Sequence, residues 1–166
     1  MLEDITEFFK GQRAKQRVVE TMLRYGMRVD HAGRIFAGPV EMAPAKFGRG
    51  LGIDRRVVIE TAKEISKNKE LFHIFYSLEP RAYIANAAKS MGHDCIVIQS
   101  DPTLSGVVAQ VTHVLAENKV PMRQITADDP DLFPDPVLTI IVQGKLSGKI
   151  INQLRALPAA HSISIK

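Results

Sequence analysis

Cysteine is almost missing from this sequence of 166 residues, which contains Cys95 alone. A single cysteine allows neither an internal disulfide nor a cysteine-based zinc site. The five histidines, at positions 31, 73, 93, 113 and 161, include no pair four residues apart, so no metal site is expected. No apolar run approaches the roughly 18 residues that cross a bilayer. The N-terminus is acidic where a signal peptide is basic, and we therefore expect a cytoplasmic protein.

Motifs for catalysis and nucleotide binding are missing too. The segment GKLSGKI (144–150) has three spacers where a phosphate-binding loop has four, and Ile follows its second Lys. The segment GRGLG (48–52) follows no apolar strand, as a dinucleotide fingerprint would. His93, Asp94 and Cys95 are adjacent, but neighbours along a strand point to opposite faces and do not form a nucleophile with its base. The sequence predicts neither an enzyme nor a cofactor.

Basic residues are concentrated in the first half of the chain. Residues 1–90 contain 16 Lys and Arg against 11 Asp and Glu, whereas residues 91–166 contain 6 against 7. A basic half beside a nearly neutral half suggests that only the first half contacts an anionic partner. A basic surface that serves only solubility would explain the charge equally well.

The first half contains helical patterns separated by turns. Residues 12–25 predict an amphipathic helix ended by Gly26 at positive φ, and residues 27–42 predict a small hairpin or loop. Residues 71–79 predict a strand that could form a wing. Residues 80–92 predict a connecting helix that begins at Pro80 and ends at Gly92.

The segment between Pro44 and Ser66 is the most informative part of this half. Pro44 suits the first turn of a helix that runs to about Leu51, and Gly52 breaks that helix. Asp54 then caps a second helix to about Ser66. The buried face of the second helix is expected to contain Val57 or Val58, Thr61, Ala62 and Ile65.

Two helices joined by a short glycine turn have helix-turn-helix geometry. The spacing of Gly48, Leu51-Gly52-Ile53 and Val58 resembles the signature of helix-turn-helix transcriptional regulators, with Gly48 where the family usually has Ala. The resemblance implies that Arg55 and Arg56 begin the recognition helix and meet base edges and phosphates. It also implies that Lys46 and Arg49 reach the DNA backbone. The alternative is a packing or dimerisation module whose arginines are merely solvated.

The second half predicts the element order β-α-β-β-α-β, which is the ferredoxin-like arrangement. The expected strands are 95–99, 120–127, 137–143 and 161–166, and the expected helices are 105–118, with Asn118 as a left-handed cap, and 147–157. The apolar strands 95–98 and 137–142 are expected to be central and parallel. Pro121 places its strand at one edge, and the alternating strand 161–166 suits the other edge.

The segments IVIQSDPTLSGVVAQVTHVLAENKVPMRQIT (96–126) and VLTIIVQGKLSGKIINQLRALPAAHSISI (137–165) resemble ACT domains. Asp101 lies five residues before Gly106, whereas many ACT domains have Asp three residues before this glycine. Both halves together resemble archaeal predicted regulators of amino acid metabolism that join a helix-turn-helix region to an ACT domain. The resemblance implies an α+β chain with DNA-binding residues 1–79, a connecting helix 80–92 and ligand-sensing residues 93–166.

The ACT resemblance implies subunits paired side by side, with an amino acid bound at their interface. The helix that begins near Ser105 offers unpaired N–H groups to a carboxylate, and Gly106 allows close approach to the backbone. Nearby acids would match the ammonium group. The candidate ligand-binding residues are Asp101, Leu104, Ser105, Gly106, Val107, Asp128 and Asp129. Loop aspartates also commonly cap turns, which is the alternative role of these acids.

The sequence thus predicts a transcriptional regulator of amino acid metabolism whose partners are double-stranded DNA and an amino acid or related metabolite. We expect a homodimer or a larger even assembly that needs no membrane. The alternative is a regulatory subunit that senses an amino acid and docks a metabolic enzyme through its first half. Salt-dependent binding to duplex DNA distinguishes the two hypotheses.

Overall fold

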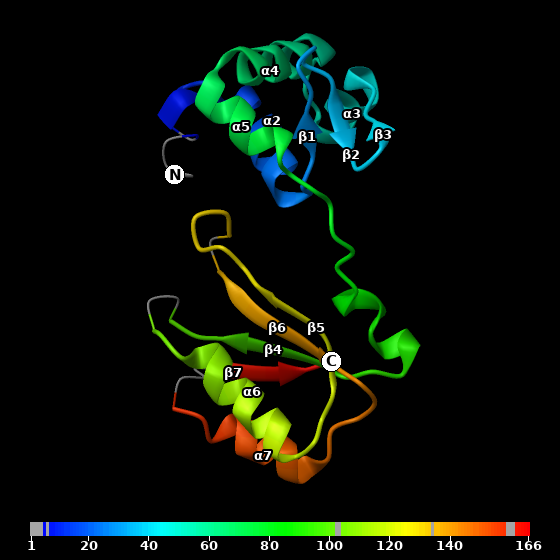
Figure 1. Cartoon of the computed structure of the whole chain (residues 1–166), viewed down its shortest axis with the longest axis vertical. Helices are drawn as coiled ribbons and strands as arrows, with labels where there is room; N and C mark the ends of the chain where they lie inside the picture. The colour runs from blue at the N-terminus through cyan, green and yellow to red at the C-terminus, as the bar shows by residue number, and fades with distance from the viewer. Residues whose placement is uncertain (1–4, 6, 102–103, 134, 159–161) are drawn as a thin grey trace. The chain divides into compact units, whose positions relative to one another are not determined.

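The computed structural model describes residues 5, 7–101, 104–133, 135–158 and 162–166 (Figure 1). The chain is α+β and divides into two compact units, Met1–Ala82 and Tyr83–Lys166, each with its own antiparallel sheet. Within the described ranges, no helix combines the length and apolar character that crossing a membrane requires.

In the N-terminal unit, helices pack around a small three-stranded sheet. Its strands pair in the order β1-β2-β3, and both pairings are antiparallel. The helices predicted at 12–25, 44–51 and 54–66 and the hairpin predicted at 27–42 are confirmed, and Gly26 has a φ of 60°. The elements are α2 (Arg13–Arg24), β1 (Arg28–Val29), β2 (Ile35–Ala37), β3 (Val40–Glu41), α3 (Pro44–Leu51), α4 (Arg55–Lys67) and α5 (Lys69–Tyr76).

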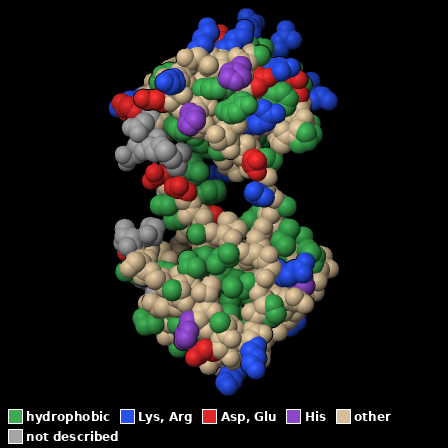
Figure 2. Space-filling view, in the orientation of Figure 1, with side chains coloured by type: hydrophobic (Ala, Val, Ile, Leu, Met, Phe, Trp, Pro, Cys, Tyr) green, Lys and Arg blue, Asp and Glu red, His purple; other side chains and the backbone are tan. Residues whose placement is uncertain are grey.

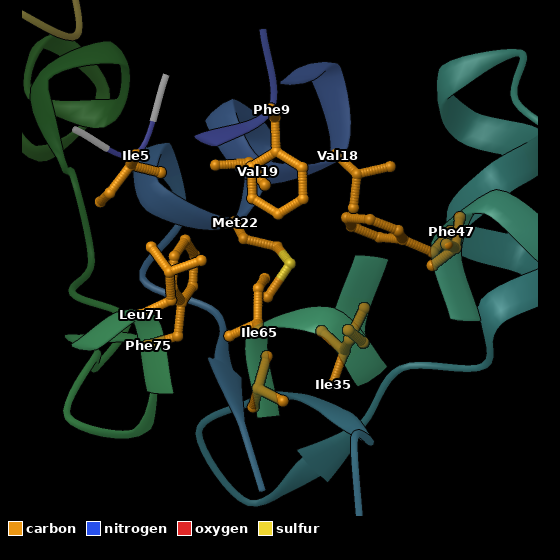
Figure 3. Close-up of a cluster of buried hydrophobic side chains, with 13 residues drawn as sticks. Ile5, Phe9, Val18, Val19, Met22, Ile35, Phe47, Ile65, Leu71 and Phe75 are labelled. Carbon is orange, nitrogen blue, oxygen red and sulfur yellow. The ribbon is translucent and has the colours of Figure 1, made fainter. Parts of the chain in front are cut away.

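One hydrophobic core holds this unit together, and Figure 3 shows side chains from several elements meeting around Met22 of α2. Ile65 of α4 and Ile35 of β2 are completely or almost completely buried in it. The predicted inner face of α4 is confirmed, since its buried residues are Val58, Thr61, Ala62 and Ile65. The hydroxyl of Thr61 donates to the backbone oxygen of Val57 at 2.7 Å, so its burial leaves no polar atom unsatisfied.

The prediction of a strand at 71–79 is wrong, because residues 69–76 form helix α5 (Lys69–Tyr76). The Asn68 side chain caps this helix by accepting hydrogen bonds from the backbone N–H groups of Glu70 and Leu71. Leu71 and Phe75, four residues apart, share its buried face. The apolar residues therefore follow the helical period rather than the alternation of a strand.

The connecting helix predicted at 80–92 is also wrong. Only two short 3-10 turns form there, η1 (Ala85–Ala87) and η2 (Lys89–Met91), although Gly92 does end the second turn with a φ of 76°. The backbone N–H of Ile84, which an α-helix would pair with residue 80, instead donates to the side-chain oxygen of Gln124 at 3.1 Å. Contacts with the C-terminal sheet thus override the local helical pattern.

The C-terminal unit has the predicted order β-α-β-β-α-β and a sheet in the order β5-β6-β4-β7. The predicted edge positions of β5, which follows Pro121, and of β7 are confirmed. The positive φ predicted at Asn118 occurs one residue later, at Lys119, with a φ of 54°. The elements are β4 (Cys95–Gln99), α6 (Val107–Glu117), β5 (Met122–Ala127), β6 (Val137–Val142), α7 (Gly148–Arg155) and β7 (Ser162–Ile165).

The two central strands were expected to be parallel, but β4 and β6 pair antiparallel, with Cys95 opposite Ile141 and Gln99 opposite Val137. Strands β5 and β6 form an antiparallel hairpin, while α6 returns the chain so that β5 runs in the same direction as β4. A strand inserted between β4 and β5 must therefore oppose both of them. The apolar runs indicated central strands correctly but not their direction.

The two faces of this sheet have different covers. Helices α6 and α7 pack on one face, where Ile96, Ile98 and Ile140 are completely buried. On the opposite face Cys95 and Ile141 pack against Ala88, which lies between η1 and η2. The segment that begins the unit is therefore part of its second hydrophobic cluster.

Candidate functional site

The turn that joins α3 to α4 packs closely against Gly48 of α3. An ideal Cβ at this position would lie 2.5 Å from the backbone oxygen of Ile53 in the turn, so there is no room for a side chain. The backbone N–H of Ile53 donates to the oxygen of Gly48 at 2.8 Å. Gly52 adopts the predicted left-handed conformation, with φ 64° and ψ 36°. The predicted turn of three residues, 52–54, is confirmed.

Polar contacts with α2 hold this helix pair in place. The guanidinium of Arg17 donates to the backbone oxygen of Leu51 at 2.7 Å, at the C-terminal end of α3. Lys15 forms an ion pair of 2.5 Å with Glu64 of α4, and the Lys15 side chain is only 16% exposed. Helix α2 thus forms a polar contact with each helix of the pair.

The four predicted DNA-contacting residues all lie on the surface of this unit. Lys46 and Arg49 belong to α3, and Arg55 and Arg56 form the first turn of α4; all four are exposed. The predicted cap is confirmed, because the carboxylate of Asp54 accepts from the backbone N–H of Arg56 at 2.8 Å. Lys and Arg side chains gather over this part of the unit in Figure 2.

A cavity of about 150 Å³ opens between the start of α6, the end of β5 and the start of β6. Four of the seven predicted ligand-binding residues line it, namely Asp101, Leu104, Val107 and Asp128. Ser105, Gly106 and Asp129 are not part of the lining. Gly106 has a φ of 85°, a conformation that suits glycine.

The acidic side chains around this cavity differ in the hydrogen bonds that their carboxylates accept. The Asp129 carboxylate accepts from the backbone N–H of Asp131 at 2.9 Å, so it caps its own turn, as the alternative role predicted. The Asp128 carboxylate accepts from the N–H of Val137 at a longer 3.3 Å and also lines the cavity. Asp128 therefore closes the base of the β5–β6 loop and faces the cavity.

Part of the cavity wall was not predicted from the sequence. The remaining lining residues are chiefly apolar: Ser100, Val108, Ala127, Pro130, Pro136, Val137 and Leu138. Val108 and Leu104, which both line the cavity, are 43% and 48% exposed. Apolar periodicity predicts that Val108 shares the buried face of its helix, so the sequence offered no signal for its place in the cavity wall.

A second polar cluster lies at the opposite end of β4. The carboxylate of Asp94 accepts from Lys145 Nζ and from the backbone N–H of Leu146, both at 2.8 Å. Burial raises the pKa of Asp94, but these two hydrogen bonds and the Lys145 charge outweigh it and hold the pKa below its ordinary value. Burial raises the pKa of the Cys95 thiol, so this cysteine is a packing residue.

Within the part of the chain that the structure describes, no three His, Cys, Asp or Glu side chains are grouped to hold a metal ion. No protein-family model matches the chain, and no curated protein matches its sequence. Among solved structures, the chain is similar to the crystal structure of PH0061, with a TM-score of 0.31 and 7% identity. That comparison covers 92% of this chain and 88% of the other. A likeness at this level carries no argument about function.

Proposed function

We propose that this protein is a transcriptional regulator that binds duplex DNA through α3 and α4 and senses an amino acid at the cavity beside α6. The observation that carries the proposal is the tight turn between α3 and α4, which packs against Gly48 and is followed directly by the exposed Arg55 and Arg56 at the start of α4. A helix-turn-helix module inserts this part of its second helix into the major groove.

The charge around this pair supports DNA as the partner. The Arg56 side chain is 83% exposed, and its contact with Asp54 is a loose 3.5 Å. An exposed ion pair of this length is worth little, so a phosphate can replace the carboxylate at small cost. Lys46 and Arg49 add two exposed cations one turn apart on α3.

Replacing both Arg55 and Arg56 with Ala tests the DNA-binding half. We expect affinity for duplex DNA to fall at least about ten-fold, since each arginine contact contributes about 1–3 kcal/mol. Each lost phosphate contact should also lower the slope of log affinity against log salt by about 1. Fluorescence anisotropy with labelled genomic fragments at several salt concentrations measures both quantities.

The matched control removes two exposed cations from α7 of the C-terminal unit, as Lys149→Ala with Arg155→Ala. This variant loses the same charge and should keep wild-type affinity. Equal losses in the two double variants would mean that only net charge matters. If the wild-type protein does not bind duplex DNA even at low salt, the docking-subunit hypothesis replaces the regulator hypothesis.

The cavity supports an amino acid with an apolar side chain as the effector. Its described lining is mostly aliphatic, includes the carboxylates of Asp101 and Asp128 and contains no Lys, Arg or His. The two acids suit an ammonium group, and the valine and leucine side chains suit an aliphatic one. The carboxylate of the effector would lie at the start of α6, where backbone N–H groups point outward.

A thermal-shift screen of the twenty amino acids tests the cavity. A ligand at a hundredfold excess over its Kd stabilises the folded state by about 2.7 kcal/mol, so an effector should raise Tm clearly. Val108→Glu places a third carboxylate at the cavity and should abolish the shift. Ala109→Glu adds the same charge at the adjacent exposed residue, outside the lining, and should preserve it. The cavity assignment fails if no amino acid shifts Tm or if both variants respond alike.

A further inference from the structure

The segment 83–91, here called the strap, is bound to the face of the sheet that α6 and α7 leave open. Ala88 is completely buried there against Cys95 and Ile141. The Tyr83 hydroxyl donates to the Thr139 hydroxyl at 3.2 Å, and the Ile84 N–H donates to Gln124 at 3.1 Å. The strap follows directly on Ala82, the last residue of the N-terminal unit (Figure 1).

The residues that hold the strap belong to the two strands that form the cavity. Thr139 of β6 is next to Leu138, which lines the cavity, and Gln124 lies on β5 three residues before Ala127. Ala127, which lines the cavity, pairs with Leu138, and Thr126 pairs with Thr139, which contacts the strap. The pair at the cavity and the pair at the strap are therefore neighbours in the β5–β6 ladder. Anything that stiffens this end of the β5–β6 hairpin also fixes the side chains that hold the strap.

The strap is held by a small apolar cluster, in which Ile84 and Ala85 are partly buried beside Ala88. Ala88 is its only completely buried side chain among these described residues, whereas Tyr83 and Met91 are 53% and 46% exposed. Its backbone forms only two 3-10 turns, which have weaker hydrogen-bond geometry than an α-helix. Segments with few buried contacts open at low free-energy cost and are therefore suited to reversible release.

We propose that occupation of the cavity holds the strap against the sheet and that an empty cavity allows its release. This inference rests on the proposed sensing function and assigns its regulatory element. A bound amino acid restricts the motion of the β5–β6 hairpin, which lowers the entropic cost of docking the strap. Because such coupling is reciprocal, release of the strap weakens binding in the cavity by the same factor. Docking or release of the strap then signals to the covalently attached DNA-binding unit whether the cavity is occupied.

Ala88→Asp tests the coupling without altering the cavity, because a carboxylate cannot remain buried against Cys95 and Ile141. Ala87→Asp is the matched control, since Ala87 is the exposed neighbour. In hydrogen exchange of the full chain without added amino acid, Ala88→Asp should accelerate exchange in peptides covering 127–138 at least about five-fold, the lower end of typical coupling. Ala87→Asp should leave these peptides unchanged.

Tyr83→Phe provides a milder test, because it removes one hydroxyl from an exposed ring and leaves the fold intact. It should accelerate exchange in residues 83–91 and, to a smaller extent, in 127–138. With L-leucine as the probe, wild-type exchange in 83–91 should slow, and the Kd for L-leucine should rise about five-fold in Ala88→Asp.

The outcomes separate the strap from the sensing proposal. If L-leucine binds with the same Kd in wild type and Ala88→Asp, the coupling is overturned while amino acid sensing stands. If neither strap variant changes exchange in 127–138, the coupling is likewise overturned. If both variants accelerate that exchange but no amino acid raises Tm, the mechanical coupling stands and the sensing function fails.

Discussion

At the scale of single residues, Gly48 and Gly50 form a natural pair for comparison within α3. Alanine at Gly48 would place its Cβ 2.5 Å from a backbone oxygen, whereas nothing lies within 4 Å of a Cβ at Gly50. We expect Gly48→Ala to destabilise the protein by about 1–3 kcal/mol, as overpacking does. Gly50→Ala should stabilise it by up to about 1 kcal/mol, because alanine reduces the entropy of the unfolded chain.

Urea denaturation of both variants checks this prediction. A Gly48→Ala protein as stable as the wild type would show that the turn can move away from α3 at no cost, and the tight packing at Gly48 would lose its significance. The same residue also shows a limit of family resemblance. Regulators with this signature usually have Ala at this position, but here the backbone of the turn leaves room only for glycine.

Residue patterns located the arginines more completely than they located the cavity. Gly52 and Asp54 define the turn and the cap of α4, so the positions of Arg55 and Arg56 followed from local sequence. The cavity depends on how the loop after β4 and the start of α6 are placed against the β5–β6 hairpin, which is a long-range property. Val137 and Leu138 could therefore be assigned to strands but not to the wall of a site.

At the scale of elements, most boundaries could be predicted because apolar periodicity and capping residues agree. The prediction of a strand at 71–79 was wrong because the short alternating pattern there is outweighed by Asn68, a cap that begins α5. The failure at 80–92 had a different cause, because the strap takes its conformation from the sheet it contacts. The local sequence contains no information about Gln124, a hydrogen-bond partner that lies 40 residues after Ile84 in the chain.

Asp94 links two elements, since it fastens the start of β4 to the loop that precedes α7. Its pKa is lowered in the folded state despite burial, so its contribution to stability is present above the unfolded pKa of about 3.9. This contribution is lost as the pH falls through the folded pKa. We expect Asp94→Asn to lower the free energy of unfolding by about 1–2 kcal/mol at neutral pH.

Urea denaturation of wild type and Asp94→Asn at neutral pH and at successively lower pH measures this difference. It should shrink on acidification, because the wild-type protein loses the ionised carboxylate that the variant never had. Asp135→Asn, at an exposed loop position, is the control and should match the wild type throughout. A difference that stays constant down to acid pH would contradict an ionic role for Asp94.

At the scale of the whole molecule, the two units differ in net charge and in where they expose apolar side chains. The excess of positive charge lies in the first 90 residues, while the C-terminal unit exposes aliphatic side chains around its edge strand. Met122 and Ile125 of β5 are 45% and 44% exposed, and β5 has no partner beyond β6 among the described strands. An uncovered edge strand with apolar side chains is a surface suited to pairing.

We therefore expect the chain to be a homodimer or a larger even assembly that pairs through β5. Multi-angle light scattering should give at least twice the chain mass of 18.4 kDa over a wide concentration range. Lysine at both Met122 and Ile125 should shift the assembly towards monomer, because like charges on adjoining edge strands repel. Val40→Lys, at an exposed apolar residue of the N-terminal unit, should leave the mass unchanged. A wild-type mass of one chain at every concentration would refute the assembly, and a dimer that the β5 variant does not weaken would place the contact on another surface.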